Sequence, residues 1–126
     1  MLLSEYLSGI INTIDEYSKT DLIVQYKTNI DIRTSKIGTI KGSITFITYS
    51  KLFFIEYLDL RYGNDKLSYS FHYQDKENEL IFRYDNAVHK PRLAFEGHKH
   101  LPDGTIVKAI APDFFAVLEE IINTFL

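Results

Sequence analysis

Apolar residues recur at spacings of three and four near both termini of the chain, and they alternate with polar residues in between. Near the N-terminus this spacing covers residues 2–17 and predicts an amphipathic helix with one apolar face. Gly9 lies inside this helix at a cost of about 1 kcal/mol relative to alanine, so we expect something to pack closely on it. Near the C-terminus Pro112 suits the first turn of a second helix. Its predicted apolar face comprises Phe114, Phe115, Leu118, Ile121, Ile122 and Phe125.

The alternating part of the chain predicts five strands, at residues 20–33, 38–48, 52–62, 66–74 and 79–85, and a short sixth at 105–110. Apolar residues on both faces at the start of 52–62 indicate a central strand. Gly42 offers a place where a helix can approach the second strand closely. The first strand is predicted to be half-buried through Leu22, Val24, Tyr26, Thr28, Ile30 and Ile32. The fourth is predicted to present one face made of Leu67, Tyr69, Phe71 and Tyr73.

Short connections between consecutive strands favour antiparallel neighbours. We therefore predict an α+β fold, in which a five- to six-stranded antiparallel meander sheet has the N- and C-terminal helices packed on one face as a two-layer sandwich. The length of 126 residues favours a single domain, 1–126. The opposite face of the sheet carries Tyr, Ser, His, Gln and Arg residues and is expected to be partly open.

The chain contains no cysteine, which excludes disulfides, Cys-based zinc sites and thiol catalysis. It has no apolar run of about 18 residues, so no membrane span is expected. Acidic residues and no basic cluster near the N-terminus argue against a signal peptide. Together these features favour a cytoplasmic protein.

The net charge of −3 argues against bulk nucleic-acid binding, but the charge is unevenly distributed. Residues 89–100 hold Lys90, Arg92 and Lys99 against Glu96 alone. A basic patch on an acidic body is compatible with a phosphate-bearing partner. The alternative is a solvated loop without a partner.

All four histidines lie between residues 69 and 100, in a stretch that is predicted to form a hairpin followed by a polar loop. In an extended segment His98 and His100 point the same way, with Lys99 opposite. Two such imidazoles serve either as metal ligands or as a general acid and base. The lysine between them works against cation binding, so we expect no metal and no cofactor.

Metal-independent RNA cleavage needs a base for the 2′-hydroxyl, an acid for the leaving oxygen and a cation for the phosphorane. The His-rich stretch contains such groups, and we predict that His98, His100 and His89 are catalytic. Phosphate or substrate binding is predicted for Arg83, Lys99, Lys90, Arg92, His72, Tyr84 and Asp85. The alternatives are structural: a surface ion pair between Arg83 and Asp85, a core position for Tyr84, and hydrogen bonds to solvent or backbone for the histidines.

Three segments of this stretch resemble the TumE family: YSFHYQD at 69–75, FRYDNAVHKP at 82–91 and HKH at 98–100. The chain departs from the family pattern at Lys90, where a second histidine is usual, and at Glu96 and Gly97, where Pro-His is usual. The resemblance implies the toxin component of a toxin–antitoxin pair, with a small helix-turn-helix protein as antitoxin. It implies no assigned catalytic residues.

Two functional hypotheses follow. The first is a toxin that acts on RNA as an endoribonuclease and is neutralised by a helix-turn-helix antitoxin. The alternative is a non-catalytic binding module that docks a partner protein or nucleic acid through its basic, His-rich loop. Both hypotheses leave a homodimer open.

Overall fold

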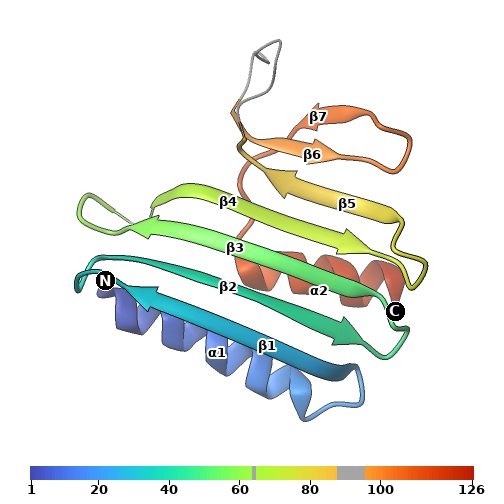
Figure 1. Ribbon diagram of the computed structural model, residues 1–126, viewed down its shortest axis with the longest axis horizontal. Helices are drawn as coiled ribbons and strands as arrows, with labels where there is room; N and C mark the ends of the chain where they lie inside the picture. Colours follow the sequence, from blue (N-terminus) through green and yellow to red (C-terminus); the bar gives the residue numbers. More distant parts are fainter. Residues whose placement is uncertain (64, 88–95) are drawn as a thin grey trace.

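The computed structural model describes residues 1–63, 65–87 and 96–126. Within these residues seven strands lie between two helices along the chain (Figure 1). The helices are α1 (Leu3–Ser18) and α2 (Phe114–Phe125). The strands are β1 (Ile23–Ile32), β2 (Ile37–Phe46), β3 (Lys51–Asp59), β4 (Asp65–Gln74), β5 (Leu80–Asp85), β6 (His98–His100) and β7 (Ile106–Lys108). Each pairs antiparallel with the next, so the sheet is a meander in the order β1 to β7.

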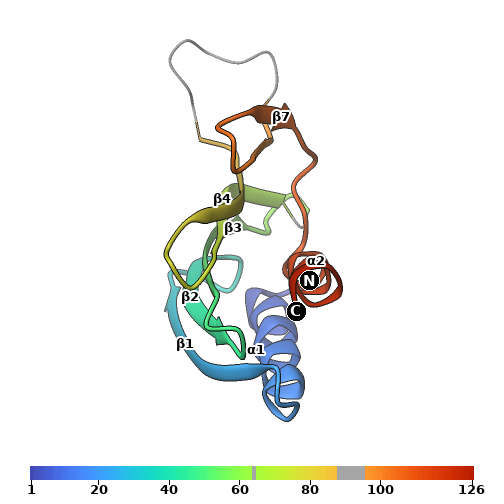
Figure 2. The same ribbon diagram turned by 90° about the vertical axis from the view of Figure 1, so that its right-hand side faces the viewer.

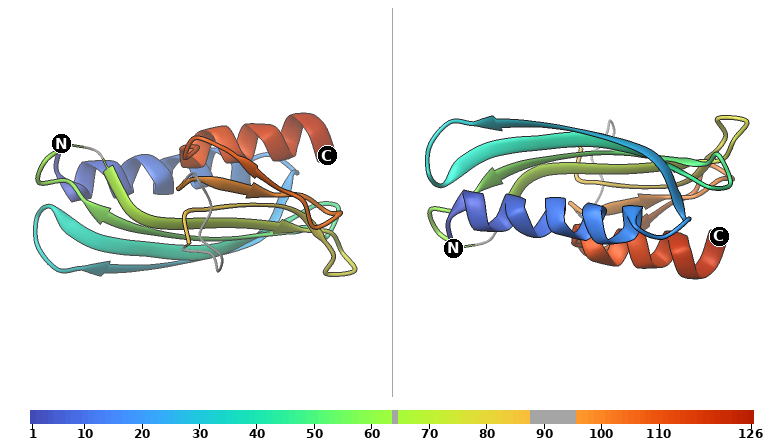
Figure 3. Two further views of the ribbon diagram at one scale, coloured as in Figure 1. Left: turned by 90° about the horizontal axis from the view of Figure 1, so that it is seen from above. Right: turned by 90° about the horizontal axis from the view of Figure 1, so that it is seen from below.

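Both helices lie on the same face of the sheet (Figures 2 and 3). The predicted α+β architecture with two terminal helices on one face is therefore confirmed, as is β3 as a central strand. The strand count is higher than the predicted five to six. The segment from His98 to His100, expected to belong to a loop, pairs with β5 on one side and β7 on the other.

The hydrophobic core lies between the helices and one face of the sheet. From the helices it takes Leu3, Leu7, Ile10, Ile14, Phe114, Val117, Leu118 and Ile121. From the central strands it takes Ile40, Ile44, Phe46, Leu52, Phe54, Leu58, Phe71, Tyr73 and Phe82. Phe115 was predicted to join the core but is 49% exposed, because it lies one position off the stripe at 114, 117, 118 and 121.

The edge strand β1 differs from its prediction, because of its ten residues only Ile23 is buried. Val24, Tyr26, Ile30 and Ile32 are between 39% and 57% exposed. Tyr26 and Ile30 pair with core residues of β2 and therefore face the helix side. They lie at the margin of the layer that α1 covers, so the alternation that predicted a half-buried strand produces an exposed apolar stripe here.

Close packing over glycine occurs at different positions from those predicted. Among the described residues, a Cβ added at Gly9 would meet nothing within 4 Å, so none of them makes the expected close contact there. A Cβ at Gly42 would lie 2.8 Å from the ring of Phe54 rather than against a helix. The close helix approach is at Gly38, where a Cβ would lie 2.6 Å from Leu3 of α1.

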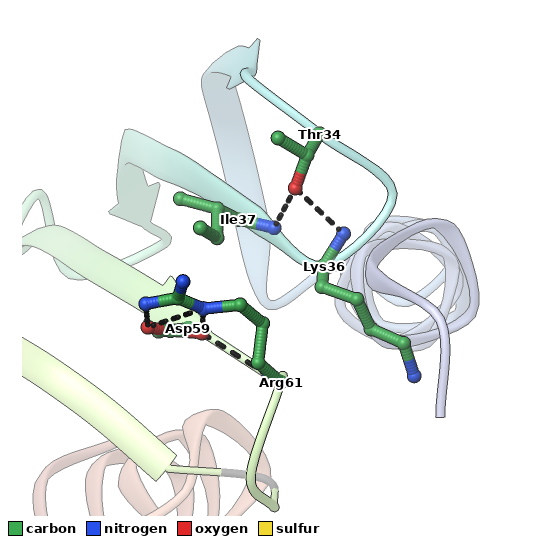
Figure 4. Close-up of polar contacts among 5 residues, drawn as sticks. All are labelled: Thr34, Lys36, Ile37, Asp59 and Arg61. Atoms are coloured by element: carbon green, nitrogen blue, oxygen red, sulfur yellow. Dashed lines mark hydrogen bonds and ion pairs between the residues drawn. The ribbon is translucent and has the colours of Figure 1, made fainter.

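The connection between β1 and β2 anchors the start of α1. Thr34 Oγ1 accepts hydrogen bonds from the backbone N–H of Lys36 and of Ile37, which tightens the turn (Figure 4). The carbonyl of Ser35 accepts from the backbone N–H of Leu3 at 3.0 Å, which satisfies one of the donors left open at a helix N-terminus. Nearby, Arg61 binds the carboxylate of Asp59 at 2.8 Å (Figure 4).

A bulge in β4 brings a lysine to the helix side of the sheet. The register between β3 and β4 shifts between Tyr57 and Leu58, whose partners are Ser68 and Lys66. The extra residue places Lys66 where alternation predicted Leu67, and Leu67 is 62% exposed.

Beneath the helices, the fully buried carboxylate of Glu56 forms an ion pair with Lys66 Nζ at 2.5 Å. Tyr6 of α1 donates to both oxygens of the Glu56 carboxylate, at 3.0 and 3.1 Å. Lys66 also donates to the carbonyl of Pro112, just before α2. Burial raises the pKa of Tyr6 and Glu56 raises it further, so the phenol remains a donor. This closed network joins both helices to the sheet.

Candidate functional site

On the face of the sheet without helices, a row of polar side chains crosses three neighbouring strands. His72 of β4 pairs with Arg83 of β5, and Arg83 pairs with His100 of β6. Directly paired residues of an antiparallel sheet share a face, so the guanidinium lies between the two imidazoles. Asp85 lies two residues beyond Arg83 on the same face and pairs with His98. The meander thus gathers residues from three separate segments of the chain.

Asp85 is the centre of this cluster. Arg83 Nε donates to Asp85 Oδ2 at 3.0 Å, and His100 Nε2 lies 3.1 Å from Oδ1. His98 Nδ1 lies 3.4 Å from the same Oδ1, at ion-pair distance. Asp85 and His98 are buried, whereas the side chains of His100 and Arg83 are 19% and 39% exposed. The accessible members of the cluster are therefore Arg83 and His100, with Asp85 behind them.

The hydrogen-bond partners of His72 and His100 determine which ring nitrogens carry a proton. An ionised carboxylate only accepts, so His100 Nε2 must carry the proton that it shares with Asp85. A guanidinium only donates, so His72 Nδ1 accepts from Arg83 Nη1, at 3.4 Å. His72 Nε2 then donates to Gln74 Oε1 at 3.1 Å, and Gln74 Nε2 donates to Asn78 at 2.9 Å. In this arrangement His72 is a neutral imidazole.

The pKa shifts agree with that assignment. Burial alone would raise the pKa of Asp85, but hydrogen bonds from Arg83 and His100 and their charges outweigh it and hold the pKa below its usual value. Burial lowers the pKa of His72, and the Arg83 charge lowers it further against the opposing effect of Gln74. The site therefore combines an ionised carboxylate with a neutral imidazole near neutral pH.

Two predicted substrate-binding residues lie on the opposite, helix-covered face. Lys99 Nζ contacts Glu120 of α2 at 2.9 Å and lies 4.9 Å from the centre of the Tyr84 ring. Tyr84 donates its hydroxyl to the same carboxylate at 2.5 Å. The structure therefore brings together His72, Arg83, Asp85, His98 and His100, but not Lys99 or Tyr84.

The remaining predicted residues, His89, Lys90 and Arg92, lie outside the described residues. Gly97, where the chain departs from the TumE pattern, is described. A Cβ there would lie 2.2 Å from the carbonyl oxygen of Ala109, so this backbone leaves no room for a side chain. In the parts of the chain that the structure describes, no group of three or more His, Cys, Asp or Glu side chains is arranged to hold a metal ion.

An open groove of about 920 Å³ runs over the same face from β1 to β5 and ends at the polar row. His72, Gln74 and Arg83 line one end of it, and Lys27, Lys41 and Phe53 line the rest. Gln74, Lys27, Lys41 and Phe53 were not among the predicted site residues. Gln74 could have been found from the sequence, because it lies two residues after His72 and residues two apart on a strand share a face.

The family model described as Toxin TumE matches residues 12–126, nearly the full chain. The chain belongs to the TumE toxin family. The resemblance carried by segments 69–75, 82–91 and 98–100 is thereby confirmed. Membership indicates a toxin of a toxin–antitoxin system and, with it, an antitoxin partner.

No curated protein and no solved structure gives a significant match to this TumE-family chain. Neither helix in the described residues is long and apolar enough to cross a membrane.

Proposed function

We propose that this TumE-family toxin cleaves RNA by metal-independent general acid–base catalysis at the row formed by His72, Arg83 and His100. The observation that carries the proposal is the position of a guanidinium between two imidazoles on neighbouring strands, with an ionised carboxylate behind it. Cleavage by the 2′-hydroxyl of RNA requires a general base, a general acid and a cation, and two imidazoles with a guanidinium between them supply these groups.

His72 acts as the base. When Arg83 turns to a phosphate oxygen, its 3.4 Å contact with His72 Nδ1 is released and that nitrogen accepts the 2′-hydroxyl proton. The 2′-oxygen then bonds to phosphorus. Arg83 stabilises the negative charge of the phosphorane.

His100 acts as the acid. It gives a proton to the 5′-oxygen as the phosphorus–oxygen bond breaks, which leaves a 2′,3′-cyclic phosphate and a 5′-hydroxyl. Asp85 orients the ring through Nε2–H, and the doubly protonated form of His100 supplies the proton.

His98 takes a different role from the one predicted. Because its side chain is only 3% exposed, it has little surface on which to meet RNA, and we assign it to positioning the Asp85 carboxylate. Lys99 and Tyr84 take no part, since they lie on the helix side with Glu120. Lys90, Arg92 and His89 remain proposed contributors to phosphate binding or catalysis.

Purified protein tests this proposal with a single-stranded RNA substrate in the presence of a chelator. The wild-type chain is expected to cleave it and leave cyclic phosphate ends, while His72→Ala and His100→Ala each lower kcat/KM about a hundredfold or more. Loss of cleavage on chelation alone would replace the acid–base scheme with a metal site. Full toxicity of both histidine variants in cells would end the catalytic proposal.

The proposed partner is a helix-turn-helix antitoxin acting in the cytoplasm, encoded beside the toxin gene. Co-expression of the adjacent gene is expected to restore growth and to yield a complex that co-purifies with the chain. Growth arrest that persists with the partner present would contradict this pairing.

A second candidate function, a non-catalytic binding module, is favoured by β1. This ten-residue edge strand presents both an unpaired backbone edge and the exposed apolar stripe of Val24, Tyr26, Ile30 and Ile32. Exposed strand edges are sites of strand addition and partner binding. If the purified wild-type chain cleaves no RNA and Ile32→Lys abolishes toxicity, the module function is supported. Sedimentation of the free chain at two concentrations tests whether the same edge forms a homodimer.

A further inference from the structure

Two aromatic rings are exposed in the middle of the sheet. Phe53 and Tyr57 of the central strand β3 are 42% and 50% exposed, on the face without helices. The alternating residues Leu52, Phe54 and Leu58 of the same strand are almost fully buried. The strand is thus well packed on one side, and its outward aromatics have no role in the core.

Two lysines lie on the same face as these rings, one on β2 and one on β1. Lys41 of β2 pairs with Ile55, and Lys27 of β1 lies in the same row as Phe53, separated from it by Ser43. Both lysines are exposed, and no carboxylate of the described residues lies at ion-pair distance from either of them. With the small Ser43 between the cation and the ring, the row forms the floor of the open groove.

We propose that this face is a binding platform for single-stranded RNA, in which an unpaired base stacks on Phe53 while Lys27 and Lys41 hold backbone phosphates. The proposal rests on the RNA cleavage proposed above and names how the substrate is held. A basic groove with aromatic side chains on a sheet surface is the combination that binds single strands through stacking and phosphate contacts. A base in a duplex has no free face for Phe53, so the platform selects single strands.

Phe53 also connects the platform to the polar row. Its ring centre lies 6.3 Å from that of His72, and the two residues pair directly across β3 and β4. A base stacked on Phe53 therefore places its adjoining phosphate toward His72 and Arg83. Phe53 thus selects which phosphodiester bond is cleaved as well as contributing affinity.

RNA fits this face better than a protein partner does. Apolar residues dominate the centre of protein interfaces and lysine is depleted there. Here the exposed rings of Phe53 and Tyr57, with the half-buried Ile55 between them, lie beside Lys27 and Lys41, whereas the exposed apolar side chains of β1 lie on the helix side. Binding of the antitoxin to the open face is an outcome that the test distinguishes.

Binding is measured by fluorescence anisotropy with a labelled 2′-O-methyl RNA of about ten nucleotides, a length within the site sizes of sheet-based binders. Blocking the 2′-oxygen prevents cleavage, so the wild-type chain can be used. Phe53→Ala is expected to weaken binding about 5- to 150-fold, the loss of one base–aromatic stack. Phe53→Leu, which keeps an apolar side chain, is expected to weaken it as well. Phe115→Ala is the matched control, because this ring has a similar exposed fraction, 49% against 42% for Phe53, and lies on α2.

Replacing the lysines tests the phosphate contacts. Lys27→Ala and Lys41→Ala are each expected to lower RNA affinity. Each is also expected to reduce the steepness of log K against log salt by about one, which corresponds to the loss of one phosphate contact. Lys19→Ala, at the end of α1, is the control and is expected to leave both unchanged.

The platform is overturned if duplex RNA binds as tightly as the single strand, or if both Phe53 variants bind like wild type. It is also overturned, in favour of a protein interface, if these variants lose only antitoxin affinity.

The platform and the catalytic proposal fail separately. If RNA binds through Phe53 but His100→Ala keeps full cleavage, the catalytic scheme fails alone. If His100→Ala abolishes cleavage while Phe53→Ala leaves KM and the cleavage position unchanged, the platform fails alone.

Discussion

The two faces of this sheet each hold a buried carboxylate with a basic partner, but the surroundings of the two carboxylates differ. Glu56 lies under the helices at 0% exposure, and its partners come from α1 and β4, with Lys66 also bonded to the segment before α2. Asp85 lies on the open face at 4% exposure, with partners on β5 and β6 beside a groove. Burial and ion pairing alone therefore do not distinguish the two carboxylates. We expect that the face of the sheet and the accessibility of the partners decide whether each one serves folding or activity.

Removing the charge of Glu56 is expected to have the largest effect on the helix face. Glu56→Gln leaves the ammonium of Lys66 buried without its counter-charge, and breaking one partner of a buried pair costs about 3–5 kcal/mol. Urea unfolding monitored by circular dichroism measures the loss. Glu5→Gln, at an exposed acid of α1, is the control and is expected to cost under about 0.5 kcal/mol. A loss below about 1 kcal/mol for Glu56→Gln would show that the network does not fasten the helices.

On the open face the corresponding change is expected to affect activity rather than folding. Asp85→Asn replaces an acceptor of the His100 Nε2 proton with a group that can also donate, which disturbs the orientation and tautomer of the ring. We expect kcat/KM to fall about a hundredfold. The free energy of unfolding should fall by only about 1 kcal/mol, since Arg83 is partly exposed and screened. A loss of stability as large as that of Glu56→Gln, with unchanged activity, would make both carboxylates structural.

The contrast between the faces was largely predictable from alternation, because side chains two residues apart share a face. That rule placed Phe71 and Tyr73 on the apolar face, and it placed His72 and Arg83 on the polar face. It also placed Lys99 opposite His98 and His100, which is where the structure has it. Grouping Lys99 with the histidines as a phosphate ligand ignored that parity.

The alternation of polar and apolar residues does not predict which residues lie opposite one another on neighbouring strands. The pairing of Arg83 with His100 depends on the connection between β5 and β6. A strand of three residues is also too short for its period to be recognised. The bulge at Lys66 reversed the parity of Leu67, and the edge position of β1 left its apolar side chains exposed. These outcomes depend on tertiary neighbours rather than on local pattern.

The pH dependence of the open face should follow His72, whose pKa lies below the ordinary 6.5 because of burial and Arg83. As the base it must be unprotonated, so the acidic limb of kcat/KM is expected below pH 6.5. The same shift affects stability. Between the folded and unfolded pKa values the unfolded chain binds more protons, so stability is greater above pH 6.5 and falls as the pH drops through the folded pKa.

The difference in unfolding free energy between the wild type and His72→Gln, measured from pH 5 to 8, isolates this contribution from those of the other histidines. It should change in favour of the wild type as the pH rises. An acidic limb above pH 6.5, or a difference that is flat with pH, would remove His72 from the role of base.

The smallest expected effect concerns Lys99, the basic residue on the helix side that neighbours the polar row in sequence. Lys99 and Glu120 are 2.9 Å apart with side chains 25% and 26% exposed, and partly exposed pairs contribute at most about 1 kcal/mol. Lys99→Gln is therefore expected to lower the free energy of unfolding by no more than that and to leave RNA affinity and kcat/KM unchanged. Arg83→Gln should do the reverse, lowering kcat/KM at least tenfold with little change in stability, since its guanidinium is proposed to bind the reacting phosphate. Measuring Lys99→Gln, Glu120→Gln and the double variant separates the ion pair from the contact of Lys99 Nζ with the Tyr84 ring. If Lys99→Gln instead lowers RNA cleavage without changing stability, substrate reaches the helix side, and the division of the sheet into a structural and a functional face is wrong.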